Sequence, residues 1–242
     1  MNEILFYNLT QTNGLTHSLA TQIARELGRR IVAGLYPQGT CLEDEMTLAE
    51  KYRVSRSVIR DAVKILVGKG LLEVRRGIGT KVRNRLEWGI LDNDVLAWHQ
   101  SAPPNRKFLM QLHEFRLVIE PKAALLAARN GTAEDYKSIE ESIHKMRETV
   151  DSAEAFVEAD ANFHRLILLA TDNEFLSAMD GIIFTSLLSS IRLTNRDTKQ
   201  NEASLSLHQD VANSIFAKKS EEAEQRMFHL LSDAKVRLTA EV

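Results

Sequence analysis

The sequence predicts a mainly α-helical protein with an N-terminal winged helix-turn-helix domain and a C-terminal all-α helical bundle. Three features of the chain favour this fold class. An early helix has one apolar and one cationic face, a glycine-rich turn follows it, and the later two thirds carry apolar residues at helical spacing. With 242 residues and 44% hydrophobic content, the chain can bury two separate cores.

The cationic helix is expected to follow Val54, with Ser55 as its cap, because a serine hydroxyl can accept a free backbone N–H at a helix start. Its apolar residues recur at the spacing of one buried face and are Ile59, Ala62, Val63 and Leu66. Its basic residues recur every four positions on another face and are Arg56, Arg60 and Lys64. Such a helix can pack on a core and present long cationic side chains to the major groove of DNA.

Neighbouring segments complete the winged helix-turn-helix. A first amphipathic helix is expected from Thr16 to about Gly34, with inward residues Leu19, Ile23, Leu27 and Ile31. A short second helix is expected at 47–52. Strands are expected at 71–74 and 80–83, joined by the turn Gly77-Ile78-Gly79. The order of these elements is helix, helix-turn-helix, two-stranded wing.

The charge of the chain is distributed unevenly. Residues 1–85 hold 14 Lys and Arg against 8 Asp and Glu, a net charge of +6. Residues 86–242 hold 17 Lys and Arg against 25 Asp and Glu, a net charge of −8. A basic module followed by an acidic one is typical of a DNA-binding head joined to a body with another task.

The expected divisions of the chain are a tail at 1–14, the winged domain at 15–85, a packed linker at 86–105 and a helical domain at 106–242. Trp88–Trp98 is too apolar for a flexible linker and is expected to dock onto one or both domains. After Pro103-Pro104, apolar residues at Leu109, Leu112, Phe115, Val118 and Ile119 predict a long helix. Further helices are expected at 133–150, 153–171, 174–194, 202–217 and 220–239.

Four residues of the helical domain form a candidate metal site. Asp160 and His164 lie four positions apart, on one face of a helix, within reach of one cation. His208 and His229 fall in the last two expected helices, and separate helices can converge in a bundle. Taken alone, each histidine is more simply a core or surface residue than a ligand.

The recognition helix and the wing resemble those of the GntR family of bacterial transcription regulators. The matching motifs are Val54-Ser55-Arg56 with Ile59-Arg60 and Ala62-Val63, and Arg76-Gly77-Ile78-Gly79-Thr80 at the wing tip. This resemblance implies a DNA-binding set of Arg56, Ser57, Arg60, Lys64, Arg75, Arg76, Gly77, Gly79 and Thr80. One departure lies in the second helix. The family often has Glu-Arg there, whereas this chain has Glu45-Met46, so the contact of that arginine is not carried over.

From about Phe108 onward the chain resembles the FCD effector domain of the FadR subfamily. The resemblance rests on Glu114–Pro121, on Asp160 with Phe163-His164, and on two isolated C-terminal histidines. It implies a divalent metal held by Asp160, His164, His208 and His229, and this donor set suits zinc or nickel better than calcium.

The subfamily resemblance also implies a homodimer on a two-fold operator and a small organic acid bound in the bundle. Arg116 and Arg192 are candidate contacts to the acid's carboxylate. An ion pair between Arg116 and Glu120, and solvation of Arg192, are the alternatives. Trp88–Trp98 resembles the linker of sugar-acid regulators, so a repressor of a sugar-acid or related organic-acid operon is expected.

Two other function classes compete with this hypothesis. A metal-dependent hydrolytic enzyme could use the same aspartate and histidines, but no His-Glu-x-x-His motif or evident general base accompanies them. An architectural DNA-binding dimer would have no use for the polar cluster. The N-terminus lacks a basic segment followed by an apolar stretch, so a cytoplasmic location is expected. The single cysteine, Cys41, is expected to be a buried small residue without a role.

Overall fold

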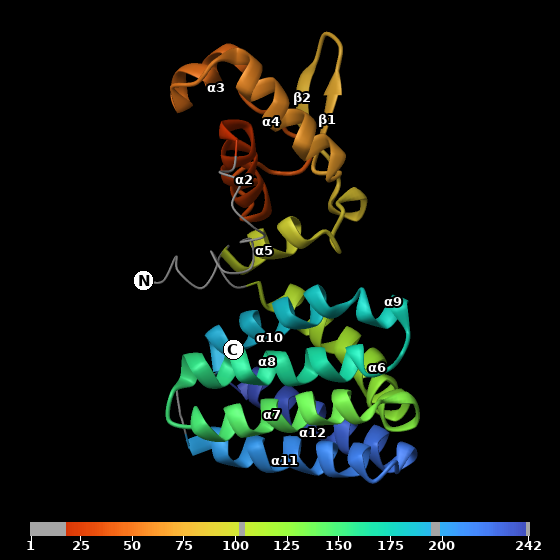
Figure 1. The fold of residues 1–242 in the computed structure, drawn as a ribbon. Helices are drawn as coiled ribbons and strands as arrows, with labels where there is room; N and C mark the ends of the chain where they lie inside the picture. Colours follow the sequence, from red (N-terminus) through yellow and green to blue (C-terminus); the bar gives the residue numbers. More distant parts are fainter. Residues whose placement is uncertain (1–17, 102–104, 195–198, 241–242) are drawn as a thin grey trace. The chain divides into compact units, whose positions relative to one another are not determined.

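The computed structural model describes residues 18–101, 105–194 and 199–240, and divides the chain into two compact units, Met1–Pro103 and Pro104–Val242 (Figure 1). The first unit contains α2 (Leu19–Val32), α3 (Glu45–Tyr52), α4 (Arg56–Gly68), β1 (Leu72–Arg75), β2 (Gly79–Val82), the 3-10 helix η1 (Arg85–Glu87) and α5 (Asn93–Ser101). The second contains α6 (Arg106–Asn130), α7 (Ala133–Glu148), α8 (Ala153–Leu169), α9 (Glu174–Ser177), α10 (Asp180–Thr194), α11 (Lys199–Phe216) and α12 (Ser220–Ala240). The expected fold class is confirmed.

The core of the first unit forms where α2 and α4 pack together. Ser55 caps α4 by accepting the backbone N–H of Val58, as expected. The four residues expected on its inner face, Ile59, Ala62, Val63 and Leu66, are all buried. The expectation for Leu19 was wrong. As the first residue of α2, just after the Ser18 cap, it lies beyond the packed stripe and is exposed.

The wing is a two-stranded antiparallel sheet in which Leu72 pairs with Val82 and Arg75 with Gly79. Gly77 and Gly79 have φ values of 79° and 113°, which other residues rarely adopt, so both glycines are required by this turn. The expectation for Cys41 was also wrong. It is exposed, because its backbone forms an antiparallel bridge with Lys81 and lengthens the wing on the open edge of β2.

The segment that was expected to be a packed linker lies on the first unit. Trp88 and Trp98 are buried in the same core as α2 and α4. The Trp88 indole N–H donates to the Arg83 carbonyl at 3.1 Å, and Lys69 forms ion pairs with Asp92 and Asp94 at 2.8 and 2.7 Å. Helix α5 is thereby a structural part of the first unit, the head.

The second unit is a helical bundle in which α12 packs along α6, α8 packs against α7 and α10, and α11 packs against α12 and α7. Its helices start at side-chain caps that include Asn105, Thr132 and Ser152. The single helix expected at 174–194 is wrong in one respect, because the chain breaks after Ser177 and α10 starts at Asp180. None of the described helices combines the length and apolarity that a bilayer crossing requires.

The inward face of α6 carries charged as well as apolar side chains. Leu109 and Leu112 are buried as expected, but Val118 is 70% exposed. The residues that face inward instead are Arg116 and Glu120, which are 3% and 1% exposed. The apolar spacing was ambiguous here because the buried face of α6 carries charged side chains.

We predict that Gly28→Ala destabilises the head. A Cβ at Gly28 would lie 2.4 Å from two carbons of the Trp98 ring, so α5 must shift, at a cost of about 1–3 kcal/mol. This exceeds the gain of up to about 1 kcal/mol from better helix propensity. Urea unfolding followed by tryptophan fluorescence measures the head selectively, because both tryptophans of the chain lie in it.

The matched control is Gly68→Ala in α4, where an added Cβ meets nothing within 4 Å. This variant should gain about 0.4–1 kcal/mol. Equal stabilisation by both substitutions would contradict the docking of Trp98 on α2.

Candidate functional site

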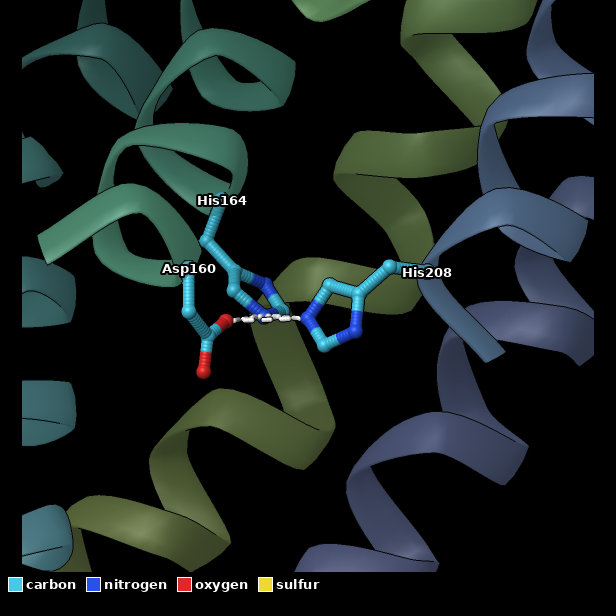
Figure 2. A group of neighbouring side chains, drawn as sticks. All are labelled: Asp160, His164 and His208. Carbon is cyan, nitrogen blue, oxygen red and sulfur yellow. Dashed lines mark hydrogen bonds and ion pairs between the residues drawn. The ribbon is translucent and has the colours of Figure 1, made fainter. Parts of the chain in front are cut away.

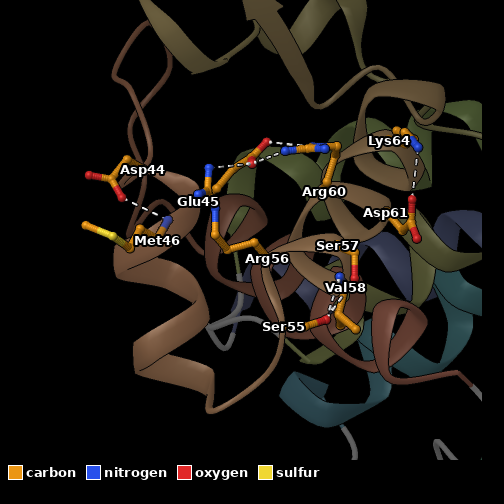
Figure 3. Close-up of polar contacts among 10 residues, drawn as sticks. All are labelled: Asp44, Glu45, Met46, Ser55, Arg56, Ser57, Val58, Arg60, Asp61 and Lys64. Carbon is orange, nitrogen blue, oxygen red and sulfur yellow. Dashed lines mark hydrogen bonds and ion pairs between the residues drawn. The ribbon is translucent and has the colours of Figure 1, made fainter.

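The first candidate site is the exposed face of α4. The side chains of Arg56, Arg60 and Lys64 are 63%, 56% and 70% exposed and lie along one edge of the helix (Figure 3). Ser57 is exposed one position after the start of the helix. Because the opposite face of α4 is buried in the head, this row of cations is presented to solvent as a recognition helix requires.

The start of α3 lies beside this row. The Glu45 carboxylate accepts from Arg60 Nε at 3.3 Å and from Nη2 at 2.9 Å, and lies 3.9 Å from Arg56 Nη2 (Figure 3). The hydrogen bond from Arg60 lowers the pKa of Glu45. Met46, at the position where the sequence departs from the family pattern, is 56% exposed. An uncharged thioether therefore stands at this surface in place of a cation.

The wing supplies the remaining residues of the expected DNA-binding set. Arg75, Arg76, Gly77 and Gly79 are exposed at its tip, and Thr80 is partly buried in β2. The Arg75 guanidinium lies 3.0 Å from the Glu73 carboxylate, which orients it along the strand. The wing thus adds cationic groups to the surface of the head.

The second candidate site is buried in the helical bundle. The structure brings together Asp160 and His164 of α8 with His208 of α11 (Figure 2). Asp160 Oδ1 lies 2.9 Å from His208 Nε2 and 3.2 Å from His164 Nε2, and the two Nε2 atoms are 3.3 Å apart. Three potential ligand atoms therefore form a nearly equilateral triangle in the interior.

The dimensions of this triangle fit a divalent metal. Bonds of about 2.0–2.1 Å at tetrahedral angles separate two ligand atoms by about 3.3 Å, and right angles separate them by about 2.9 Å. His208 Nδ1 lies 2.7 Å from the Ser204 carbonyl, a contact that fixes the ring and directs Nε2 at the triangle. His164 Nδ1 is held in the same way by the Glu120 carboxylate. Each imidazole thus has the outer contact that metal-bound histidines usually make.

Glu120 is the residue that sequence reasoning missed at this site. It lies on α6, four positions after Arg116, and accepts from Arg116 Nε at 2.5 Å as well as contacting His164. Arg116 Nη2 in turn lies 3.4 Å from His164 Nε2. The only feature of the sequence that pointed to Glu120 was its four-residue spacing from Arg116. That spacing suggested an isolated ion pair rather than a link to the metal-site residues.

The ionisation of the cluster follows from burial and close partners. Burial raises the pKa of Asp160, but the two imidazoles outweigh it and hold that pKa below its usual range. Burial likewise opposes ionisation of Glu120, and Arg116 with His164 lowers its pKa to about 2. Burial lowers the pKa of His164, whereas Glu120 and Asp160 raise it by a larger amount. Both carboxylates therefore carry their negative charges inside the bundle.

His113 is a second residue without an expected role that the structure places inside. It is 3% exposed on α6, one turn before Arg116, and its Nε2 has no hydrogen-bond partner among the described residues. Burial lowers the pKa of His113 to about 4, with a smaller contribution from Arg116, so the ring is neutral. A neutral imidazole with a free nitrogen is a buried polar group whose hydrogen bond is unsatisfied in this structure.

One expected site residue is not brought to the cluster, and the side chain of another is not among those that the structure describes. His229 lies exposed on α12, where the buried neighbour is Leu230, so the structure does not place this residue with Asp160, His164 and His208. The face of α12 that turns inward carries Met227, Leu230 and Leu231, which leaves His229 on the outer side. Arg192 lies in α10, but its side chain is outside the described residues.

Comparisons with known proteins match both units. Residues 19–82 match the family described as "Bacterial regulatory proteins, gntR family", and residues 111–233 match the FCD domain. The galactonate operon transcriptional repressor of Escherichia coli (strain K12) is 30% identical over 226 residues, which are 93% of this chain and 98% of that protein. The uncharacterized regulator YieP of the same organism is 32% identical over 202 residues, or 82% and 86% of the two chains.

A solved structure shares the fold across both units. It is that of Lar, which controls the expression of the Listeria monocytogenes agr system, with a TM-score of 0.66 at 17% identity over 94% of this chain and 99% of that one. The two family matches together account for the cationic helix, the wing and the helical bundle. The chain belongs to the gntR family of bacterial regulatory proteins, carries an FCD domain after its DNA-binding head, and is a transcription regulator rather than an enzyme.

Proposed function

We propose that this protein is a repressor of an operon for the catabolism of a sugar acid or related organic acid, and that it binds a two-fold operator as a homodimer. The observation that carries the proposal is the buried triangle of Asp160, His164 and His208 in a chain with an exposed recognition helix. An architectural dimer would have no use for such a cluster. The likeness to the galactonate operon repressor along nearly its whole length supports a sugar acid as the ligand class.

The triangle would hold a divalent metal, for which we propose zinc, with nickel as the alternative. Two imidazole nitrogens and one carboxylate oxygen suit these ions, whereas calcium prefers six to eight oxygen donors. The ion would supply a Lewis acid toward the oxygen atoms of a ligand. With three protein donors, coordination positions remain for water or for the effector.

Charge in the cluster favours an anionic effector. With both imidazoles neutral, as binding of a metal requires, Arg116 contributes one positive charge and Glu120 and Asp160 contribute two negative charges, so the cluster has one negative charge in excess. A divalent cation reverses that excess to one positive charge. A monocarboxylate then balances it, which agrees with a small organic acid as ligand.

Neighbouring side chains favour a hydroxylated acid. Arg116 uses Nε for Glu120 and has further N–H groups that can donate to a carboxylate. His113 Nε2 is a buried acceptor that a ligand hydroxyl would satisfy. Arg192 of α10 is the second cation that we propose for the effector site. This combination of donors and an acceptor is the reason for preferring hydroxy acids over fatty acids.

Regulation requires that the acid bind the DNA-competent and DNA-incompetent dimers with different affinities. The segment Trp88–Trp98 is the proposed transmitter. Because it is packed into the core of the head, a displacement of α5 would carry α4 with it. The separation of the two recognition helices would then no longer match half-sites about one DNA turn apart.

We predict that Arg60→Ala weakens binding to the preferred DNA by about 1–3 kcal/mol and reduces sequence preference, because an exposed arginine on α4 can read guanine through two hydrogen bonds. Arg75→Ala should instead weaken binding to all sequences and flatten the salt dependence by about one unit of slope. Fluorescence titration at several salt concentrations, with duplexes selected by this protein from a random pool, measures both. Unchanged preference in Arg60→Ala would refute the assignment of α4.

We predict about one bound divalent ion per chain, and its loss in His164→Ala/His208→Ala together with a lower melting temperature of the bundle. His229→Ala should keep the ion, because His229 lies outside the cluster. Elemental analysis of the purified proteins measures occupancy, and tryptophan fluorescence checks that the head is unaffected. Retention of the ion by the double variant would rule out this site. Loss of the ion from His229→Ala would restore the four-ligand set.

We predict that a hydroxy-carboxylate of the aldonate class binds in a metal-dependent manner and weakens DNA binding. Arg116→Lys should reduce the affinity, because a lysine keeps the charge but loses the planar set of donors. Calorimetry against aldonates, tricarboxylates, lactate and fatty acids, with and without chelator, measures binding. Tight fatty-acid binding in chelator, or an acid that binds without changing DNA affinity, would overturn this mechanism.

A further inference from the structure

An acidic side chain lies on the surface of the head that is expected to face DNA. The Glu45 side chain is 34% exposed at the first position of α3, beside the cationic row of α4 (Figure 3). A carboxylate at this place repels DNA phosphates and lowers affinity for every sequence. Its contacts with Arg60 and Arg56 indicate a role that offsets this loss of affinity.

The Arg60 guanidinium offers two pairs of parallel N–H donors. One pair comprises Nε and Nη2, and the other comprises Nη1 and Nη2. Glu45 accepts from the first pair, with Oε1 facing Nε and Oε2 facing Nη2. The second pair stays available at the end of the side chain. That end is suited to donate to O6 and N7 of a guanine.

We propose that Glu45 is a positioning residue for base readout. It holds Arg60 through Nε and Nη2, so that the Nη1 and Nη2 pair at the end of the Arg60 side chain can donate to a guanine. The inference rests on the proposed DNA-binding role of α4. A long exposed arginine samples many rotamers, and fixing it only on binding costs free energy. A carboxylate from the neighbouring helix fixes it beforehand. Arg56, which lies 3.9 Å from the same carboxylate, is drawn toward the same place.

This role predicts one effect of removing Glu45 on overall affinity and another on sequence preference. Removing the Glu45 charge strengthens binding to any duplex, because a repulsion with phosphates disappears. It also weakens the preference for guanine, because Arg60 is no longer held. A carboxylate that only stabilises the start of α3 through the helix dipole would change the melting temperature without changing the preference.

The experiment compares Glu45→Ala with Glu50→Ala, which removes an exposed carboxylate elsewhere on the same helix. The probes are a duplex selected by the unaltered protein from a random pool, versions in which each guanine of the half-site is replaced by adenine, and a scrambled duplex. Fluorescence titrations at several salt concentrations give the affinities, and thermal unfolding gives the stability of each variant.

Glu45→Ala should bind the scrambled duplex more tightly and lose about five- to tenfold of the preference at one guanine position. Glu50→Ala should keep the full preference, and Glu45→Gln, which retains one acceptor oxygen, should lie between Glu45→Ala and the unaltered protein. In an Arg60→Ala background, Glu45→Ala should cause no further loss, since the two residues act through one contact.

An unchanged preference in a folded Glu45→Ala variant would overturn the proposal. A loss of sequence preference at a cytosine position that persists in the Arg60→Ala background would also overturn the proposal, because Glu45 would then read the base itself. Full preference in Arg60→Ala alone is a different result, which would refute the DNA-binding role of α4 rather than the contribution of Glu45.

Discussion

Burial of two ionised carboxylates is the constraint on which the helical unit depends. Glu120 and Asp160 lie inside the bundle, where an uncompensated charge is strongly unfavourable. Compensation comes from Arg116 on the same helix as Glu120, and from His164 and His208 on two others. Helices α6, α8 and α11 must therefore keep fixed rotations about their axes. Val118 turns outward for the same reason, since the inner face of α6 is occupied by charged groups.

In both units a carboxylate orients a cationic or metal-ligating side chain, but the carboxylate of the bundle is buried and that of the head is exposed to solvent. In the bundle, Glu120 fixes Arg116 and the His164 ring in the buried interior, where electrostatic contacts are strong. On the head, Glu45 meets Arg60 at an exposed surface, where an ion pair contributes little to stability. The value of the exposed pair is orientation rather than stabilisation. Loss of the buried pair would disturb folding, whereas loss of the exposed one would change only what the surface recognises.

The head extends further along the chain than its motif. Trp88 and Trp98 bury their rings in the core formed by α2 and α4, and Gly28 provides the space for Trp98. Lys69, close to the end of α4, is tied to Asp92 and Asp94 before and within α5. Recognition helix, wing and α5 are therefore one packed body, and a force applied at α5 acts on the DNA-reading surface.

The order of elements in the head could be predicted from the sequence. These elements depend on local signals, namely the Ser55 cap, the four-residue repeat of cations on α4 and the glycines of the wing, and each acts within a few residues. The sequence also determined that Asp160 and His164 share a helix face. The remaining members of the cluster depend on packing between helices, because the apolar repeat of a helix defines a buried stripe but does not specify which charged residues lie in it.

Only packing between distant helices placed Glu120 inside. The same holds for Trp88–Trp98, whose apolar character required a partner surface without specifying it. His229 differs, because Met227, Leu230 and Leu231 recur at the spacing of one helix face and leave His229 off that face. Local periodicity fixes which residues can be buried together along one helix. Neighbouring helices, joined through contacts between residues far apart in the chain, fix which of those residues meet.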